Sequence, residues 1–281
     1  MKGRPPIDDG DAEVIAAIQA RPPYRAIDRA FVARVLTFVS RPGMKAEDRL
    51  RAARARLHQT VGAYRGSARI LEDAIVAIED AARANDPSAV DAACRAAMRW
   101  HASTRERLPT IDTFLTWALP AGERVGSIVD VGCGLNPLWL GLRPRRGGPR
   151  YRAIEVDDAI GRAVARVLTA LGVDATISGE DVTAPNWSVG PEIDVLLLMK
   201  VLPNLEQVES GAGTRVLRAN RARRTIVTFP GRSLGGSAKG MFRTYDAWFR
   251  RAAEGMDGSI ETRTIGEELC FRIDAPTREG G

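Results

Sequence analysis

The spacing of apolar residues divides the chain into two parts. Residues 1 to about 120 contain almost no strand-like run, and apolar side chains there recur at helical spacing between breaks such as R-P-P, R-P-G and N-D-P. The approximate ranges of the predicted helices are 11–20, 28–38, 46–64, 68–83 and 88–108. We therefore expect an all-helical N-terminal domain over residues 1–108.

After about residue 126, short apolar runs alternate with helical patterns. The predicted strands are 128–131, 151–155, 173–177, 193–199 and 225–229, followed by a hairpin at 259–263 and 268–273. Predicted helices lie between them at 159–171, 203–219 and 245–253. The run D-V-L-L-L-M is apolar enough to be buried on both faces of a sheet. This order predicts an α/β fold over residues 109–281, with a mostly parallel sheet that ends in an antiparallel pair.

A glycine turn follows the first predicted strand. Gly132-Cys133-Gly134 stops the β-branched run, and a helical pattern begins at Asn136-Pro137. Such a turn lets the backbone approach a ligand at the carboxyl end of a parallel strand, where open α/β sheets bind nucleotides. It lacks the third glycine of the dinucleotide fingerprint. It resembles the D-x-G-x-G motif of S-adenosylmethionine-dependent methyltransferases, with Asp130 anchoring the loop; the alternative is an ordinary tight turn.

Acidic residues follow at the ends of two later strands. Glu155 lies about 20 residues after the glycine turn, where a nucleoside-binding sheet carries the acid that binds the ribose hydroxyls. Asp157 instead suits a helix N-cap. After the third strand, Asp181 and Val182 are expected to flank an adenine, with the acid accepting from its exocyclic amine. The alternative for Asp181 is an Asx-turn in a loop.

Lys200 stands at the end of the fourth predicted strand, in L-M-K-V-L-P-N-L. Methyltransferases that act on exocyclic amines of bases often carry an N-P-P-Y type motif at this point, and that motif is absent. Its absence favours a nucleophile with a free lone pair, such as guanine N7, which needs no general base. Lys200 is then expected to bond guanine O6 or a phosphate, unless it is simply a solvated lysine.

The charge of the chain indicates a partner. The net charge of +6 comes mostly from arginine, which favours phosphates and base edges, although a GC-rich gene gives the same composition. The predicted helix 46–64 carries basic residues that are expected to bind RNA phosphates, unless they form an ordinary solvated face: Arg49, Arg51 and Arg54. The stretch 229–241, with four glycines, adds Arg232 and Lys239 and predicts a loop that closes over RNA; a spacer is the alternative.

Other features limit the setting of the protein. Its three cysteines lack metal-ligand spacing, and no apolar run of about 18 residues could span a bilayer. The first residues lack the apolar core of a signal peptide. We expect a cytoplasmic protein that acts as a monomer, without a metal or a membrane partner.

Several of these stretches, taken together, resemble one family. In chain order they are R-A-R-L-H-Q-T-V-G-A-Y (54–64), H-A-S-T-R-E-R-L (101–108), C-G-L-N-P-L (133–138), L-L-L-M-K-V-L-P-N-L-E (196–206), T-F-P-G-R-S-L-G-G-S-A-K-G-M (228–241) and T-I-G-E-E-L (264–269). The chain is similar here to the aminoglycoside-resistance 16S rRNA (guanine(1405)-N(7))-methyltransferases. Residues 1–44 and 143–150 match the pattern poorly.

The resemblance implies a Rossmann-like class I methyltransferase sheet preceded by a helical domain that docks on the small ribosomal subunit. It also implies a site for S-adenosylmethionine, in which Arg107 pairs with the methionine carboxylate. The residues implied to contact the cofactor are Tyr64, His101, Ala102, Ser103, Arg107, Gly132, Glu155, Asp181, Val182 and Met199. The family often has Asp where this chain has the longer Glu155.

The implied activity is methyl transfer to guanine N7 of 16S rRNA within the assembled small subunit. It would give resistance to 4,6-disubstituted aminoglycosides such as gentamicin and kanamycin. Two alternatives remain: a non-catalytic RNA-binding protein with a relic methyltransferase fold, and a methyltransferase of small molecules.

Overall fold

The strands form one mixed sheet in the computed structural model, which describes residues 9–62, 66–142, 148–190, 193–219, 222–231 and 240–276. Their order is β3-β2-β1-β4-β5-β7-β6, and β7 alone runs against its neighbours β5 and β6. The strands are β1 Ser127–Val131, β2 Arg150–Ile154, β3 Ala175–Ser178, β4 Ile193–Met199, β5 Ala222–Pro230, β6 Ser259–Ile265 and β7 Glu268–Asp274. The predicted α/β fold with a terminal antiparallel pair is confirmed.

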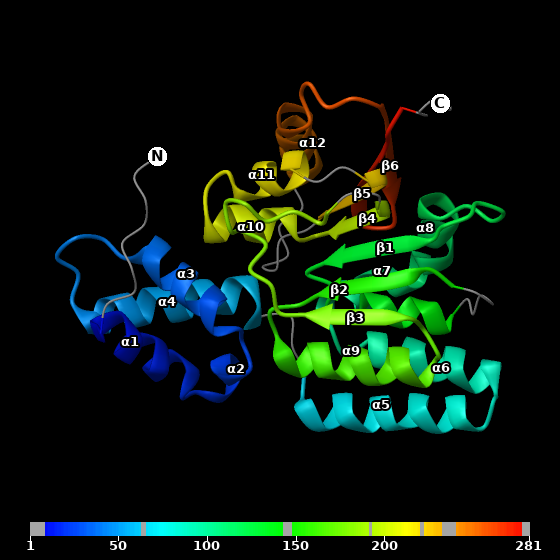
Figure 1. Cartoon of the computed structure of the whole chain (residues 1–281), viewed down its shortest axis with the longest axis horizontal. Helices are drawn as coiled ribbons and strands as arrows, with labels where there is room; N and C mark the ends of the chain where they lie inside the picture. The colour runs from blue at the N-terminus through cyan, green and yellow to red at the C-terminus, as the bar shows by residue number, and fades with distance from the viewer. Residues whose placement is uncertain are drawn as a thin grey trace.

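Helices cover both faces of this sheet (Figure 1). Successive side chains of a strand point to opposite faces, so Val195 and Leu197 of β4 join one core while Leu196 and Leu198 join the other. The first core contains α5 Ala68–Arg83, α6 Pro87–Met98, α8 Ile111–Ala118 and α9 Asp158–Ala170. The second contains α10 Leu202–Val208, α11 Ala212–Ala219 and α12 Met241–Ala252.

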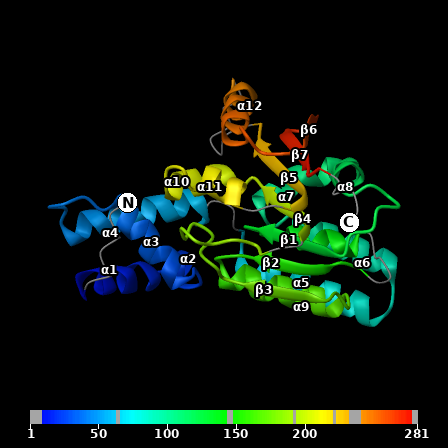
Figure 2. The same ribbon diagram turned by 45° about the horizontal axis from the view of Figure 1, so that its top comes forward.

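The first four helices pack separately from those two cores. They are α1 Asp9–Gln19, α2 Pro22–Arg25, α3 Arg29–Val39 and α4 Ala46–Thr60. Their apolar side chains form a third core, which Val208 of α10 joins. Figures 1 and 2 both show α1–α4 at one end of the molecule, while α5 and α6 lie along the sheet. The helices of the expected domain 1–108 therefore contribute to two different cores.

Local structure differs from prediction where a helix is interrupted. The predicted helix 203–219 is two helices, because Gly211 between them adopts a left-handed backbone with φ of 84°. The predicted helix 88–108 ends at Met98, and α7 (Ala102–Arg107) begins after His101, whose backbone is extended. The helical pattern after Asn136 folds as a 3-10 turn, Asn136–Gly141, packed against α6.

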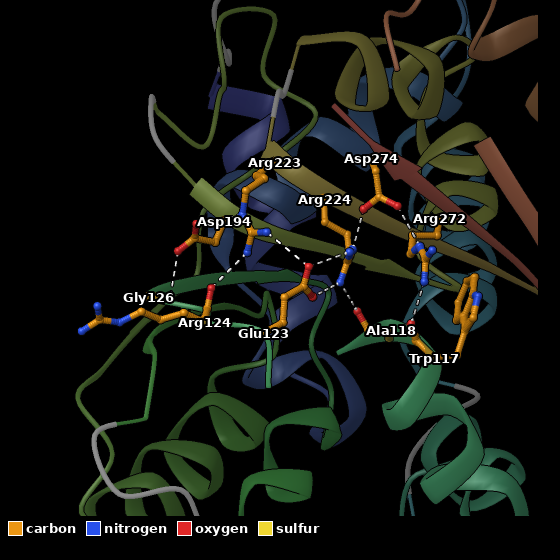
Figure 3. Close-up of polar contacts among 10 residues, drawn as sticks. All are labelled: Trp117, Ala118, Glu123, Arg124, Gly126, Asp194, Arg223, Arg224, Arg272 and Asp274. Carbon is orange, nitrogen blue, oxygen red and sulfur yellow. Dashed lines mark hydrogen bonds and ion pairs between the residues drawn. The ribbon is translucent and has the colours of Figure 1, made fainter. Parts of the chain in front are cut away.

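A cluster of ion pairs closes the amino end of the parallel strands (Figure 3). Arg224 at the start of β5 contacts Glu123 at 2.5 Å and Asp274 at 2.6 Å, and Arg223 contacts Asp194 at 3.3 Å. We call these five residues the amino-end cluster. It fastens the segment before β1 and the end of β7 to the starts of β4 and β5. In the described part of the chain, no helix is long and apolar enough to cross a bilayer.

Candidate functional site

A cavity lies where β1, β2 and β4 end, and it holds about 810 Å³ of empty space that opens partly to solvent. This is the edge at which the chain order of the strands reverses, between β1 and β4, where open α/β sheets bind ligands. Of the residues expected to form the site, those that line the cavity are His101, Ser103, Gly132, Glu155, Val182, Met199 and Lys200. The structure therefore brings most of them together.

The glycine turn leaves room that no other residue would leave. Gly132 and Gly134 adopt positive φ angles of 62° and 50°, which favour glycine. A Cβ on Gly132 would lie 2.7 Å from Cγ2 of Val201, and one on Gly134 would lie 3.0 Å from Cε1 of His101. The turn thus presents bare backbone to the cavity, as a closely approaching ligand requires.

Glu155 faces the cavity directly after β2 and also holds the glycine turn. Its carboxylate accepts hydrogen bonds from the backbone N–H of Gly134 at 2.9 Å and of Asp157 at 3.0 Å. Asp157 caps α9 by accepting from the N–H of Ala159, so the N-cap interpretation of Asp157 is confirmed. One carboxylate therefore both faces the cavity and holds the glycine turn.

Asp130 lies one step deeper, under the turn. Its Oδ2 accepts a hydrogen bond from the Tyr151 hydroxyl at 2.8 Å, and the residue is fully buried. Burial raises the pKa of Asp130 to about 7, although the Tyr151 hydrogen bond and the charge of Arg107 act in the opposite direction. Asp130 thus belongs to the support of the turn and does not line the cavity.

Asp181 lies in the loop after β3, between two residues that line the cavity, Glu180 and Val182. Its Oδ1 accepts hydrogen bonds from the N–H and the hydroxyl of Thr183, at 2.9 and 2.6 Å. This is the Asx-turn that the sequence offered as the alternative. Its Oδ2 pairs with Arg34 of α3. The Asp181 side chain itself does not line the cavity.

Lys200 is buried and paired at the end of β4. Its side chain is 6% exposed, and its Nζ lies 2.6 Å from Oε2 of Glu106 and 3.1 Å from Oε1 of Glu268. Its backbone has φ of 58°, an uncommon conformation for a residue other than glycine. Backbone strain of this kind is often retained at functional sites. Lys200 is therefore not the solvated lysine of the alternative interpretation.

Arg107 lies behind Lys200 and is 3% exposed. Its guanidinium donates to Oδ1 of Asn136 at 2.7 Å and to Oε2 of Glu268 at 2.9 Å. Burial acts to raise the pKa of Glu268, but the charges of Arg107 and Lys200 outweigh it and hold that pKa below the usual range. We call Arg107, Glu268, Lys200, Glu106 and Asn136 the cavity-edge cluster. Arg107 does not line the cavity.

Residues 101–103, which are also expected to contact the cofactor, are held by a contact between two of their own side chains. His101 Nδ1 lies 2.9 Å from Oγ of Ser103, and both residues line the cavity. Ala102 is buried at the start of α7 and does not line it. Tyr64 lies outside the described residues.

The basic residues expected to bind RNA have different surroundings. Arg51 is 77% exposed and pairs only locally with Asp48. Arg49 pairs with Asp11 of α1, and Arg54 donates to the carbonyl oxygen of Ala17 at 2.7 Å. Arg49 and Arg54 therefore also fasten α4 to α1. Arg232 and Lys239 lie outside the described residues.

Prediction from sequence missed part of the cavity wall. Phe31 of α3, together with Thr60 and Val61 at the end of α4, lines the cavity opposite the sheet. Nothing in their apolar spacing distinguishes these residues from ordinary core positions. Thr60 and Val61 do fall within the run 54–64 that resembles the family, and this was the available signal.

Comparisons with known proteins agree with this geometry. A family model described as "Ribosomal RNA methyltransferase (FmrO)" matches residues 20–271. The 16S rRNA (guanine(1405)-N(7))-methyltransferase of Serratia marcescens is 32% identical over 262 residues, which cover 93% of this chain and 97% of that protein. The protein of the same name from Frankia casuarinae is 35% identical over 222 residues, covering 77% and 76%. The crystal structure of the 16S rRNA methyltransferase RmtF in complex with S-adenosyl-L-homocysteine matches with a TM-score of 0.81 and 28% identity, over 96% of this chain and 100% of that chain.

Proposed function

The chain belongs to the ribosomal RNA methyltransferase (FmrO) family, and we propose that it transfers a methyl group from S-adenosylmethionine to N7 of the guanine at position 1405 of 16S rRNA. The similarity to relatives named for this reaction extends over 97% of one of them and 76% of another. We further propose that the substrate is the assembled small ribosomal subunit, that the protein acts as a monomer, and that methylation gives resistance to gentamicin and kanamycin.

The observation that carries the proposal is the cavity with bare glycine backbone at the ends of β1 and β2. The cavity opens partly to solvent, and its wall combines this bare backbone with apolar and polar side chains, as small-molecule sites do. In this proposal Glu155 and the backbone of Gly132, which line the cavity, bind the ribose, and Val182 contacts the adenine beyond it. His101 and Ser103 lie on the other side of the glycine turn, where they can contact the methionine portion.

When bound, S-adenosylmethionine supplies an electrophilic methyl group, so that transfer forms an N–C bond to guanine N7, breaks the C–S bond and leaves S-adenosylhomocysteine. Guanine N7 has a free lone pair and no proton to lose, so no side chain has to act as a general base. The protein's contribution is to position the base and to exclude water.

Lys200 is the residue that we assign to positioning the guanine. An ammonium group has three donors; one donates to Glu106, and Glu268 lies 3.1 Å away as an ion-pair partner. A remaining donor can reach guanine O6 or a phosphate from the cavity wall.

Arg107 is proposed to bind the methionine carboxylate. Its guanidinium holds Asn136 and Glu268, so a direct bond to the methionine carboxylate requires it to share or exchange one of these partners. Its charge favours an anion at this end of the cavity in either case.

The RNA contact is assigned to the helices α1–α4 and to the basic residues predicted from the sequence. Arg51 is the most available of the predicted group, since Arg49 and Arg54 bind within the protein. Arg232 and Lys239 of the glycine-rich stretch belong to the same proposal. Phosphate contacts of this kind would make subunit binding dependent on salt.

The direct test is incubation of the protein with methyl-labelled S-adenosylmethionine and, separately, intact small subunits, free 16S rRNA or small-molecule acceptors. Borohydride and aniline then cleave RNA at N7-methylguanine. We expect label in intact subunits and cleavage at guanine 1405. RNA binding without methyl transfer would favour a non-catalytic RNA-binding protein. Label found only in small molecules would favour a methyltransferase of small molecules.

A susceptibility panel in a sensitive bacterium tests the consequence. Methylation at N7 removes an acceptor from the major-groove edge of guanine and leaves a positive charge there. We expect resistance to gentamicin and kanamycin, with apramycin and neomycin largely retaining their potency. High apramycin resistance without cleavage at guanine 1405 would show that the nucleotide is wrong.

A further inference from the structure

The adenine-side loop is held by a closed ring of polar contacts that begins in the N-terminal helices. Arg34 of α3 pairs with Asp181, and its Nη1 lies 3.4 Å from Oε2 of Glu209 at the end of α10. Asp181 accepts from Thr183, and Arg215 of α11 donates to the Thr183 carbonyl oxygen at 2.8 Å. Arg215 closes the ring on Glu209 at 3.1 Å. Two arginines from different parts of the fold therefore hold one loop.

The two arginines hold it in different ways. Arg215 contacts only backbone of the loop, through Thr183. Arg34 contacts the Asp181 carboxylate itself, and among the described residues it is the partner of that carboxylate from outside the loop. The direction of the Asp181 carboxylate thus depends on Arg34, whereas the path of the loop depends on both.

Asp181 keeps acceptor capacity in this arrangement. A carboxylate offers about four acceptor positions. Thr183 takes two of them on Oδ1, and Arg34 takes one on Oδ2. One position on Oδ2 is left for a donor, on the oxygen whose direction Arg34 sets. A charge-assisted hydrogen bond from an amine at that position is of the stronger kind.

Helix α3 is itself fixed to the rim of the cavity. The N–H of Asp28, its N-cap, donates to the carbonyl oxygen of Val156 at 2.7 Å, and the N–H of Asp158 donates to that of Ala26 at 2.8 Å. Phe31, one turn before Arg34, lines the cavity. The start of α3 is therefore tied to the segment that follows Glu155, and Arg34 projects from a fixed base.

We propose that Arg34 is a positioning residue for adenine recognition. It holds Asp181 beside Glu180 and Val182, which line the cavity, so that the open acceptor position on Oδ2 can receive the exocyclic amine of an adenine that enters there. Selectivity for adenine would then depend on the N-terminal helices. The proposal rests on the function proposed above, in which the cavity holds S-adenosylmethionine with its adenine beside Val182. It adds a residue from the stretch 1–44, which carries none of the motifs on which the family resemblance was based.

The test compares the affinities of the full-length protein for S-adenosylhomocysteine and S-inosylhomocysteine, measured by calorimetry. The second ligand carries a carbonyl oxygen in place of the amine, so it presents an acceptor instead of a donor at the position that would meet Asp181, and its donor is the neighbouring N1–H. We expect the natural protein to prefer the adenine ligand by about 10- to 100-fold, as a hydrogen bond to a charged group suggests. In Arg34→Met the preference should fall to about threefold or less, with the affinity for the inosine ligand nearly unchanged.

Three further variants separate the positioning of the carboxylate from a general loosening of the loop. Arg215→Met releases the loop backbone without touching the carboxylate, so it should weaken both ligands alike and leave their ratio intact. Arg34→Lys keeps a charged donor on a shorter side chain. It should therefore keep part of the preference for the adenine ligand that Arg34→Met loses. Arg29→Met, on the exposed side of α3, should behave as the natural protein.

The outcomes distinguish a failure of the proposed function from a failure of the role of Arg34. A natural protein that binds neither ligand would overturn the proposed function. One that methylates RNA but binds both ligands equally, or an Arg34→Met variant that keeps the full preference, would overturn the role of Arg34 alone. A ratio that falls as far in Arg215→Met as in Arg34→Met would show that loop order, and not the direction of the carboxylate, sets the preference.

Discussion

Buried arginines anchor both ends of β7, but the two clusters differ in what surrounds them. At the amino-end cluster, Arg224 is buried while its acidic partners Glu123 and Asp274 are each 28% exposed (Figure 3). At the cavity-edge cluster, Glu268 is only 4% exposed, and its two cations are buried with it. The acid shared by the two cations of the second cluster is therefore far less solvated than the acids of the first, although Glu106, the other partner of Lys200, is 44% exposed.

The difference indicates what each cluster is for. Acids that remain partly exposed lose little solvation free energy on folding. The amino-end cluster can therefore stabilise the fold simply by joining the strands and the loop. Charges withdrawn from water are costly, and an apolar replacement is often as stable. The cavity-edge cluster places two buried cations on one buried acid beside a cavity, while its second acid, Glu106, stays 44% exposed. Burying three charges beside a cavity suits a role in the site better than it suits stability alone. We therefore expect mutations at the amino-end cluster to lower stability without affecting activity, and mutations at the cavity-edge cluster to lower activity.

The largest expected effect is that of Glu268→Gln, which neutralises the acid between Arg107 and Lys200. Two buried cations then lose their shared partner, and breaking a buried pair typically costs about 3–5 kcal/mol of unfolding free energy. Turnover of the protein that remains folded should fall at least tenfold, on the order of one lost positioning contact. Urea unfolding and single-turnover methylation measure the two quantities.

Asp274→Asn is the matched control, since it makes the same chemical change at the other end of the same strand. Because Asp274 is partly solvated, we expect a loss of about 1 kcal/mol and unchanged turnover. If Asp274→Asn reduced turnover as much as Glu268→Gln, the division between the two clusters would be wrong.

Arg224→Met should lower stability by about 3 kcal/mol without affecting chemistry. The substitution removes the cation that Glu123 and Asp274 share, and it frees the carbonyl oxygen of Ala118, to which Arg224 donates at 3.2 Å. Thermal unfolding should show the loss, and the affinity for S-adenosylhomocysteine at low temperature should stay within about twofold. A cofactor affinity that fell with stability would mean that the amino end also shapes the cavity.

Lys200→Met should have the converse effect. Glu268 keeps Arg107, so the expected stability change is smaller than for Glu268→Gln. Turnover should fall about 100-fold, as for one lost donor at a reacting group, while cofactor affinity changes by less than about twofold. Lys200→Gly is the companion variant, because glycine accepts the left-handed backbone and removes the strain together with the amine. A Lys200→Met variant with weak cofactor binding and normal turnover would reverse the assignment.

The sequence predicted the sheet well because strand signals are local. The apolar run of β4 and the helical pattern of α5 were predicted with the bounds that the structure shows, 193–199 and 68–83. The helix 88–108 was predicted as continuous, since the break at His101 depends on a contact between Thr104 and the Met98 carbonyl oxygen that spacing does not reveal. Helix α8 was missed, because its apolar residues stand where the pattern changes from helices to strands.

The site was predictable as far as it follows strand ends. Glu155, Lys200 and the glycine turn meet at the cavity because parallel strands end at one edge. The partners of Arg107 and Asp181 were not predictable, because Glu268 and Arg34 lie more than a hundred residues away in the chain. Such pairings are set by packing between distant elements and leave no periodic signal.

The smallest expected effect concerns Asp130, which lies near the cavity-edge cluster but has no ion-pair partner of its own. Its pKa is raised to about 7, so between about pH 4 and 7 the folded protein holds a proton that the unfolded chain releases. The stability that this group contributes is therefore present at low pH and is lost as the pH rises through about 7. Glu268, whose pKa is lowered, behaves oppositely: its contribution is present above about pH 4.5 and is lost on acidification.

The pH dependence of unfolding can thus identify which buried acid is paired. We expect Asp130→Asn to gain stability relative to the natural protein as the pH rises from 5 to about 8, measured by urea unfolding at each pH. Asp158→Asn, at an exposed acid near the start of α9, should follow the natural curve. If Asp130→Asn also ran parallel to the natural protein throughout this range, Asp130 would already be ionised in the fold. The cations of the cavity-edge cluster would then compensate for its burial as they do for that of Glu268.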